Sequence, residues 1–159
     1  GVDRRGLVNE NDVARLMEFR QARESIFKTN LAKGKITADN VRGKDKVFSA
    51  DKLLDNNFET YWAADDGVTK ASLTLDFGRE TEFNQVLLQE NIALGQRVKK
   101  FSIQIWNGQG FETVAQATTI GYKRIIRFPK VKTDKLKVVI EDSKACPTLS
   151  TLEVYKGDF

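Results

Sequence analysis

The stretch "LLDNNFETYW" gathers side chains that could bind a ligand. Its oxygen-bearing residues are Asp55, Asn56, Asn57, Glu59 and Thr60. A hard cation such as Ca²⁺ prefers about six to eight oxygen ligands drawn from carboxylates, carbonyls and hydroxyls. The same residue types also turn a chain, because Asp and Asn side chains accept hydrogen bonds from the backbone two residues further on. The residues alone therefore leave a ligand-binding loop and a simple turn both open.

The side chains that most often perform catalysis are scarce. The chain contains no histidine and a single cysteine, Cys146. Serine–histidine triads and the commonest transition-metal sites are therefore excluded, as are an internal disulfide and a thiolate cluster for zinc. Hydrolysis by two carboxylates needs neither residue, but Asp65 and Asp66 are a poor pair because consecutive side chains tend to point apart. Catalysis by these residues is constrained, though not excluded.

Charge and hydropathy argue against two classes of partner. The 26 Lys and Arg residues outnumber 22 Asp and Glu, which gives a net charge of +4. Nucleic-acid-binding proteins usually show a basic stripe with stacking aromatic side chains. Here the lysines are scattered at the spacing of the polar faces of strands, so we predict a solvated surface and no nucleic-acid partner. No run of about 18 apolar residues is present, so no membrane insertion is expected.

Two kinds of periodicity divide the chain. From Asn9 to Phe27 apolar residues recur every three or four positions, which is typical of a helix with one apolar face. From Val47 onward the pattern alternates with period two, as in "ASLTLDFG", after which a turn is expected at Gly78, and as in "FSIQIW". About eight such segments are separated by turn residues. The sequence therefore predicts an all-β fold, an antiparallel β-sandwich of the jelly-roll type with an N-terminal α-helix. The expected divisions are a helical tail at 1–30, a Gly/Lys-rich linker at 31–46 and the sandwich at 47–159.

Both tryptophans are expected to pack within the protein. Trp62 follows the oxygen-rich stretch, where an aromatic side chain would seal the core behind the loop. Trp106 precedes the hairpin signal "NGQG", and we expect it to pack at the edge of a sheet.

Two parts of the chain resemble known families. The motifs "LLDNNFETYW", "LTLDFG", "LLQENIALGQRVKKFSIQIW", "IGYKRIIRFP" and "STLEVY" resemble, in this order, the discoidin-like sandwich. That galactose-binding-domain-like fold is shared by coagulation factor 5/8 type C domains and family 32 carbohydrate-binding modules. The head, "VDRRGLVNENDVARLMEFRQAR", resembles the end of the catalytic barrel of a glycoside hydrolase family 29 α-L-fucosidase.

These resemblances imply a function. The nucleophile and the acid/base of the barrel would lie upstream, so the chain would be a non-catalytic C-terminal accessory domain of an exported α-L-fucosidase. It would stabilise its own N-terminal catalytic domain or position that domain on substrate, in the periplasm or outside the cell. The alternative is an independent carbohydrate-binding module that recognises galactose- or fucose-containing glycans.

The discoidin resemblance also implies a structural calcium site. In that pattern Lys52 and Asn57 offer backbone carbonyls, and Asp55 offers a carboxylate. Thr60 would offer its carbonyl and its hydroxyl, and Glu153 in the last strand would close the site. We therefore expect bound Ca²⁺, with the capping turn as the alternative.

The sugar site of galactose-binding members is matched only in part. Those members commonly place a histidine, a basic residue and an aromatic residue at one end of the sandwich. This chain has no histidine near Lys70 and no aromatic residue near Cys146. Tyr122 and Lys123 could recognise an acidic group or line an interface. The other candidates for sugar binding, or for the interface with the catalytic domain, are Asp65, Glu90, Arg97 and Arg124.

Overall fold

The computed structural model describes residues 29–57 and 59–157, in which eight strands and four short 3-10 helices are found. The strands are β1 (Lys35–Ala38), β2 (Trp62–Ala63), β3 (Ala71–Gln89), β4 (Val98–Trp106), β5 (Phe111–Ala117), β6 (Arg124–Ser143), β7 (Thr148–Leu149) and β8 (Thr151–Tyr155). The 3-10 helices are η1 (Arg42–Lys44), η2 (Lys46–Phe48), η3 (Ala50–Leu54) and η4 (Ile92–Leu94). No helix in these two ranges has the length and apolar character needed to span a bilayer. The N-terminal helix expected from the sequence lies outside the described residues.

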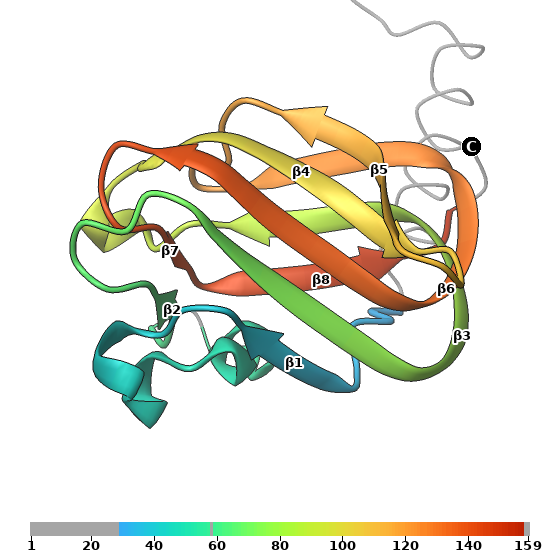
Figure 1. The fold of residues 1–159 in the computed structure, drawn as a ribbon, viewed down its shortest axis with the longest axis horizontal. Helices are drawn as coiled ribbons and strands as arrows, with labels where there is room; N and C mark the ends of the chain where they lie inside the picture. Colours follow the sequence, from blue (N-terminus) through green and yellow to red (C-terminus); the bar gives the residue numbers. More distant parts are fainter. Residues whose placement is uncertain (1–28, 58, 158–159) are drawn as a thin grey trace, which may run out of the picture.

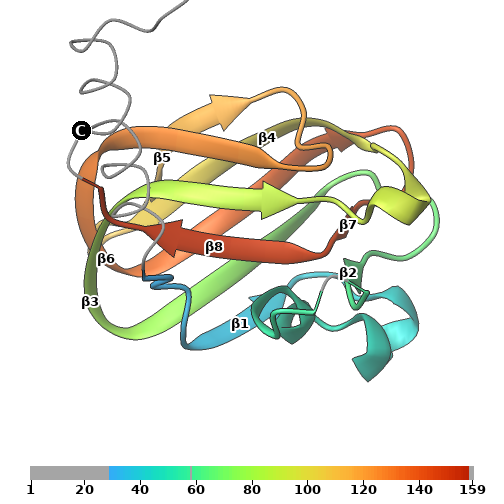
Figure 2. The same cartoon turned by 180° about the vertical axis from the view of Figure 1, so that it is seen from behind.

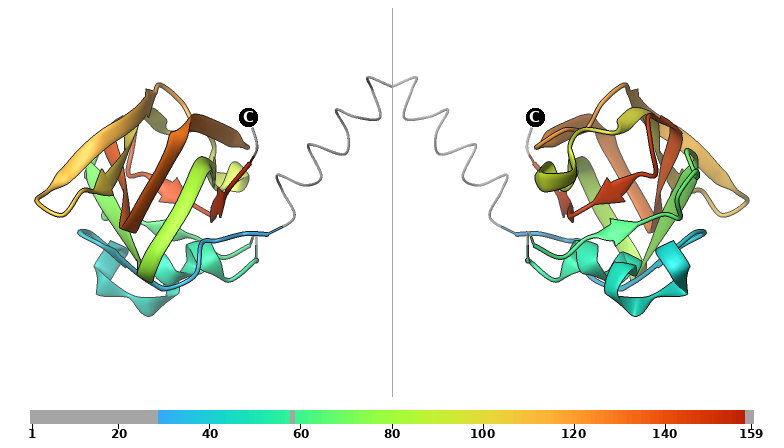
Figure 3. Two further views of the ribbon diagram at one scale, coloured as in Figure 1. Left: turned by 90° about the vertical axis from the view of Figure 1, so that its right-hand side faces the viewer. Right: turned by 90° about the vertical axis from the view of Figure 1, so that its left-hand side faces the viewer.

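Two long strands bend and so belong to both layers of a sandwich. β3 and β6 pair antiparallel along both of their halves, with an irregular register between Asp76 and Thr81. In one layer the strand order is β1-β3-β6-β4-β5, to which β3 contributes residues 71–76 and β6 contributes residues 135–140. In the other layer β8 pairs with the second half of β3, which pairs in turn with the first half of β6. The sheet thus folds over on itself into a five-stranded and a three-stranded layer (Figures 1, 2 and 3). An all-β antiparallel sandwich is confirmed.

The turn expected at Gly78 is a bend inside one strand. Gly78 adopts φ 76°, a conformation that glycine reaches without steric cost, and its N–H donates to Asp76 Oδ1 at 2.9 Å. Chain reversal is not needed there because the second half of β3 continues into the other layer.

The core lies between the layers and follows the alternation seen in the sequence. Leu73 and Leu75 of β3 and Phe101 and Ile103 of β4 are all buried. Trp62 is fully buried, and its Nε1–H donates to the Asn40 carbonyl at 2.9 Å, so the predicted core role is confirmed. The predicted hairpin is also found, since β4 and β5 pair in register around Asn107 and Gly110. Beside it, Trp106 packs on Phe111 of edge strand β5, with ring centroids 5.3 Å apart.

The segment expected as a linker, 31–46, is part of the sandwich. β1 pairs with residues 73–76 of β3, and the Leu31 N–H donates to the Val154 carbonyl at 2.7 Å. At Gly34, whose φ is 139°, an added Cβ would lie 2.1 Å from the carbonyl oxygen of Asp76, so the glycine permits this close approach. The Gly/Lys-rich composition that suggested a linker reflects an edge strand, which presents one face to water.

Candidate functional site

Five connecting segments meet at one end of the sandwich, at the left in Figure 1. They are 39–45, 64–70, 90–97, 118–123 and 144–147. We call this the loop end. Hydrogen bonds between these segments hold them together. Of the residues that the sequence suggested for ligand or interface contacts, all but Arg124 lie in these segments.

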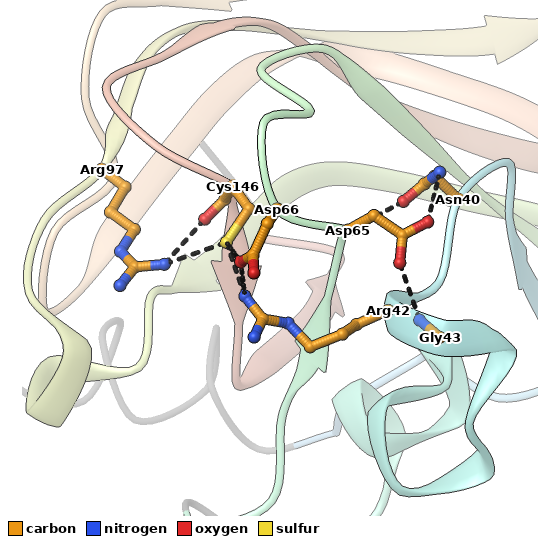
Figure 4. A network of polar contacts seen from close by, with 7 residues as sticks. All are labelled: Asn40, Arg42, Gly43, Asp65, Asp66, Arg97 and Cys146. Atoms are coloured by element: carbon orange, nitrogen blue, oxygen red, sulfur yellow. Dashed lines mark hydrogen bonds and ion pairs between the residues drawn. The ribbon is translucent and has the colours of Figure 1, made fainter.

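Asp65 joins two of these segments. Its backbone N–H donates to Asn40 Oδ1 at 2.7 Å, and Asn40 Nδ2 donates to Asp65 Oδ2 at 3.4 Å (Figure 4). The Gly43 N–H donates to the other carboxylate oxygen of Asp65 at 2.7 Å. Both oxygens of this carboxylate therefore already accept hydrogen bonds from the protein.

Two guanidinium groups converge on Cys146. Arg42 Nη2 lies 2.9 Å from Cys146 Sγ and 2.7 Å from Asp66 Oδ1. Arg97 Nη1 lies 3.2 Å from the same sulfur and donates to the Cys146 carbonyl at 3.0 Å (Figure 4). The hydrogen bond to Cys146, aided by the negative charge of Asp66 and opposed by burial, raises the pKa of Arg42 above its usual value. These contacts hold both arginine side chains and connect four of the five loop segments.

Glu90 has a different role from the one expected. Its side chain is 2% exposed, so it does not reach an external ligand or a partner surface. One carboxylate oxygen accepts from the N–H groups of Arg97 at 2.8 Å and Val98 at 2.9 Å, and the other accepts from Gly121 at 2.7 Å. Glu90 thus anchors two loop segments from inside, and the structure removes it from the set of surface candidates.

The connection between β5 and β6 carries exposed side chains at the loop end. Tyr122 is 68% exposed, and Arg124 is exposed at the first position of β6. A Cβ on Gly121 would lie 3.6 Å from the Gln96 side chain, so this connection lies against the segment that carries Arg97.

The loop after η3 brings three of the expected calcium ligands together. Asp55 Oδ1 accepts from the Asn57 N–H at 2.9 Å, and Asn57 Oδ1 accepts from the Glu59 N–H at 2.9 Å. The Thr60 hydroxyl donates to Asp55 Oδ2 and lies 3.0 Å from the Asn57 carbonyl oxygen. The turn-capping hydrogen bonds of the alternative are therefore present, and the oxygens of Asp55, Asn57 and Thr60 also converge.

The remaining expected ligands lie on neighbouring elements. Lys52 is in η3, which packs against β8, the strand that carries Glu153. Glu153 Oε1 accepts from the Tyr155 hydroxyl at 3.0 Å, and burial together with this carboxylate raises the pKa of Tyr155 to about 12. In residues 29–57 and 59–157 no three Cys, Asp or Glu side chains gather as a metal-binding group.

Comparison with known proteins places the chain in a family. Residues 35–152 match the model of the F5/8 type C domain. The chain belongs to this domain family.

Relatives of this F5/8 type C domain are larger proteins. A protein of Oryza sativa subsp. japonica, named as a candidate alpha-L-fucosidase 1, is 36% identical over 157 residues, which are 97% of this chain and 30% of the rice protein. A candidate alpha-L-fucosidase from Bacteroides thetaiotaomicron, known as a crystal structure, superposes with a TM-score of 0.87 and 34% identity over 99% of this chain and 35% of its own. The F5/8 type C domain thus spans about a third of the length of these relatives, and a catalytic domain is absent from the matched share.

A smaller protein shares the fold alone. The chitosan-binding module 1 of a Paenibacillus chitosanase/glucanase, known as a crystal structure of a mutant, superposes with a TM-score of 0.70 at 23% identity, over 79% of this chain and 97% of the module.

The contacts that hold the loop end together were only partly visible in the sequence. Asp65 and Arg97 could be selected as charged residues in loops, but Arg42 and Asn40 could not. Arg42 and Cys146 are separated by 104 positions, and no local pattern links them.

Proposed function

We propose that this F5/8 type C domain is the non-catalytic accessory domain of an exported α-L-fucosidase. The observation that carries the proposal is coverage, because nearly the whole chain aligns with about a third of proteins named as α-L-fucosidases. The lack of histidine and the use of Glu90 as an internal anchor agree with a domain that performs no chemistry. Its partner would be the catalytic domain of the same protein, which it would stabilise or position on glycans in the periplasm or outside the cell.

Hydrolysis of an aryl α-L-fucoside tests this proposal. The 159-residue chain alone should release no product, whereas the full-length protein that carries it should. Deleting the domain from the full-length protein should lower its melting temperature or its kcat/KM on fucosylated glycans. Turnover by the isolated chain would overturn the proposal, and so would an inactive full-length protein that is properly folded.

Within this function, we propose that the loop after η3 holds a structural Ca²⁺. Convergence of the Asp55 carboxylate, the Asn57 carbonyl and the Thr60 hydroxyl supports the site, and hard cations prefer this mixture of oxygens. Lys52 and Glu153 would complete the ligand set. A bound ion would neutralise the Asp55 carboxylate and hold the loop in one conformation.

The melting temperature in calcium and in chelator tests the metal site. Calcium at about 100 times its Kd stabilises a folded protein by roughly 2.7 kcal/mol, so chelation should lower the melting temperature by several degrees. Asp55→Ala should abolish the difference, whereas Asp45→Ala, a carboxylate that caps η2 elsewhere on the surface, should keep it. Equal melting temperatures with and without calcium would show that the loop is only a capped turn.

A carbohydrate-binding module is the second candidate function. The exposure of Tyr122 favours it, because a flat aromatic side chain can stack on the apolar face of a sugar. Asp65, Arg97 and Arg124 lie at the same end, and the arginines could donate to sugar hydroxyls. In a panel of fucosylated and galactosylated glycans, Tyr122→Ala should then lose binding, whereas Val47→Ala, also highly exposed, should not. Absence of binding to every glycan would dismiss this function.

A further inference from the structure

The end of the sandwich opposite the loop end contains a cavity with an aromatic wall. Its volume is about 660 Å³, and Trp106 lines it together with residues from the bend of β3 and from the middle of β6. Figure 1 shows the β4–β5 hairpin and the bend of β3 at this end, on the right. We call it the hairpin-end cavity. Its size lies within the range of about 300–1,000 Å³ that small-molecule sites occupy.

The hairpin-end cavity is well separated from the loop end. Arg97 immediately precedes β4, and Trp106 is the last residue of that strand. Because an extended strand rises about 3.3 Å per residue, these two positions lie roughly 30 Å apart. A ligand at one end cannot contact the other end at the same time unless it is an extended chain.

The indole of Trp106 is held in place by the surrounding structure. Phe111 packs against it nearly edge-on, and Lys135 Nζ lies 5.2 Å from the ring centroid. Neither of these residues lines the cavity, whereas Trp106 does. The backbone of this residue is held as well, because the Thr133 hydroxyl donates to the Trp106 carbonyl at 2.7 Å. A side chain fixed in this way loses little conformational entropy when a ligand covers it.

Charged groups around the indole are available for hydrogen bonds. Among the residues that the structure describes, the side chains of Arg79, Glu80 and Asp134 form no hydrogen bond and no ion pair, although all three line the cavity. Lys132 is paired loosely with Glu82, at 3.7 Å. This differs from the loop end, where Asp65 and Glu90 already accept hydrogen bonds from the protein.

An aromatic wall with unpaired donors and acceptors matches the chemistry of a sugar. A pyranose offers an apolar ring face to an aromatic side chain and hydroxyl groups to charged partners. Both signs of charge line the cavity, since the basic residues Arg79 and Lys132 lie beside the acidic residues Asp76, Glu80 and Asp134, so no strongly charged ligand is favoured.

We propose that the hairpin-end cavity binds a neutral sugar unit of a glycan. The sugar ring lies against Trp106, Arg79 donates to its hydroxyls and Asp134 accepts from them. The site is distinct from the loop end, and it does not depend on the chain being part of an α-L-fucosidase.

Tryptophan fluorescence offers a direct test, because the chain has two tryptophans and Trp62 is fully buried. Quenching by acrylamide therefore reports on Trp106. We would titrate the 159-residue chain with the methyl glycosides of fucose, galactose, glucose and N-acetylglucosamine and with neutral oligosaccharides that contain them. At least one of these should reduce the quenching constant about twofold at saturation.

Variants separate this site from the loop end. Loss of one charge-assisted hydrogen bond costs about 1.5–3 kcal/mol, so Arg79→Gln and Asp134→Asn should each raise the Kd by roughly tenfold or more. Both positions are at the surface, so these variants should keep the wild-type melting temperature. Tyr122→Ala, at the loop end, should bind as the wild type does. The proposal is overturned if no sugar protects the indole, or if Tyr122→Ala loses binding while Arg79→Gln and Asp134→Asn retain it.

Hydrolysis of the aryl fucoside by the full-length protein is a separate measurement. If sugars protect Trp106 but the full-length protein has no fucosidase activity, the sugar site stands and the proposed function is wrong. If the full-length protein is active but no sugar protects Trp106, the proposed function stands and the sugar site is wrong.

Discussion

The two ends of the sandwich use charged side chains in opposite ways. At the loop end, Glu90 and Asp65 accept hydrogen bonds from backbone N–H groups. At the hairpin end, Arg79 and Asp134 face a cavity and have no such partner among the described residues. A charged residue in a loop is therefore not by itself a sign of a ligand. What distinguishes a structural group from a binding group is whether the protein already satisfies its hydrogen bonds.

The largest effect that tests this comparison is expected for Glu90→Ala. The change would leave three backbone N–H groups without an acceptor, that of Val98 buried and those of Arg97 and Gly121 partly buried, and a buried group left unpaired costs about 1–3 kcal/mol. We expect the free energy of unfolding, measured with urea, to fall by about 3 kcal/mol or more. Glu80→Ala, at the hairpin end, serves as the matched control and should stay within about 0.5 kcal/mol of the wild type. Equal losses for the two variants would remove the distinction between the ends.

A smaller effect should measure the coupling within the loop end. Asn40 and Asp65 share two hydrogen bonds, one of which uses the Asp65 backbone. A double-mutant cycle with Asn40→Ala and Asp65→Ala isolates the side-chain part, since the backbone bond is lost in both Asn40 variants. The expected coupling in the free energy of unfolding is about 1 kcal/mol. Strictly additive losses would mean that the two side chains act independently and that Asn40 does not hold the Asp65 carboxylate in place.

The smallest effect is expected in the pH dependence of the melting temperature, to which the surface carboxylate of Glu82 contributes. The hydrogen bond from Lys156, at 2.8 Å, and the positive charges of Lys156 and Lys132 lower the pKa of Glu82 below its usual value of 4.5. Because the folded-state pKa is lowered, the stabilisation is fully present above pH 4.5 and is lost as the pH falls through the folded-state pKa. Melting temperatures of Glu82→Gln should therefore decline less in acid than those of the wild type. Parallel declines would show that water screens these pairs completely.

Local sequence patterns were sufficient for most strands. The alternation in "ASLTLDFG" predicted which side chains of β3 are buried, and "NGQG" predicted the β4–β5 hairpin. Both signals extend over a few residues and depend on side-chain direction and turn conformation, which neighbouring residues determine. The burial of Trp62 was predicted for a related reason, because an aromatic residue directly after a polar loop marks the return to the core.

Other features could not be derived in this way. β1 was taken for a linker because its edge position leaves it with a polar, lysine-containing sequence. The continuity of β3 through Gly78 was missed because a glycine signals a turn equally well when the strand only bends. Glu90 was expected to contact a sugar or the catalytic domain, but a glutamate can be buried when its charge is satisfied. Its three N–H partners come from two different segments, so no local pattern indicates the burial.

The sequence by itself determined the fold class, the hairpin, the core alternation and the likeness to F5/8 type C domains. Tertiary structure alone decided which polar side chains are satisfied by the protein and which are not. Arg42 meets Cys146 across 104 positions, and Trp106 meets the bend of β3 only because the folded sheet returns to the same end. Periodicity and turn chemistry act over a few neighbouring residues, whereas the partner of a hydrogen bond is fixed by the path of the whole chain.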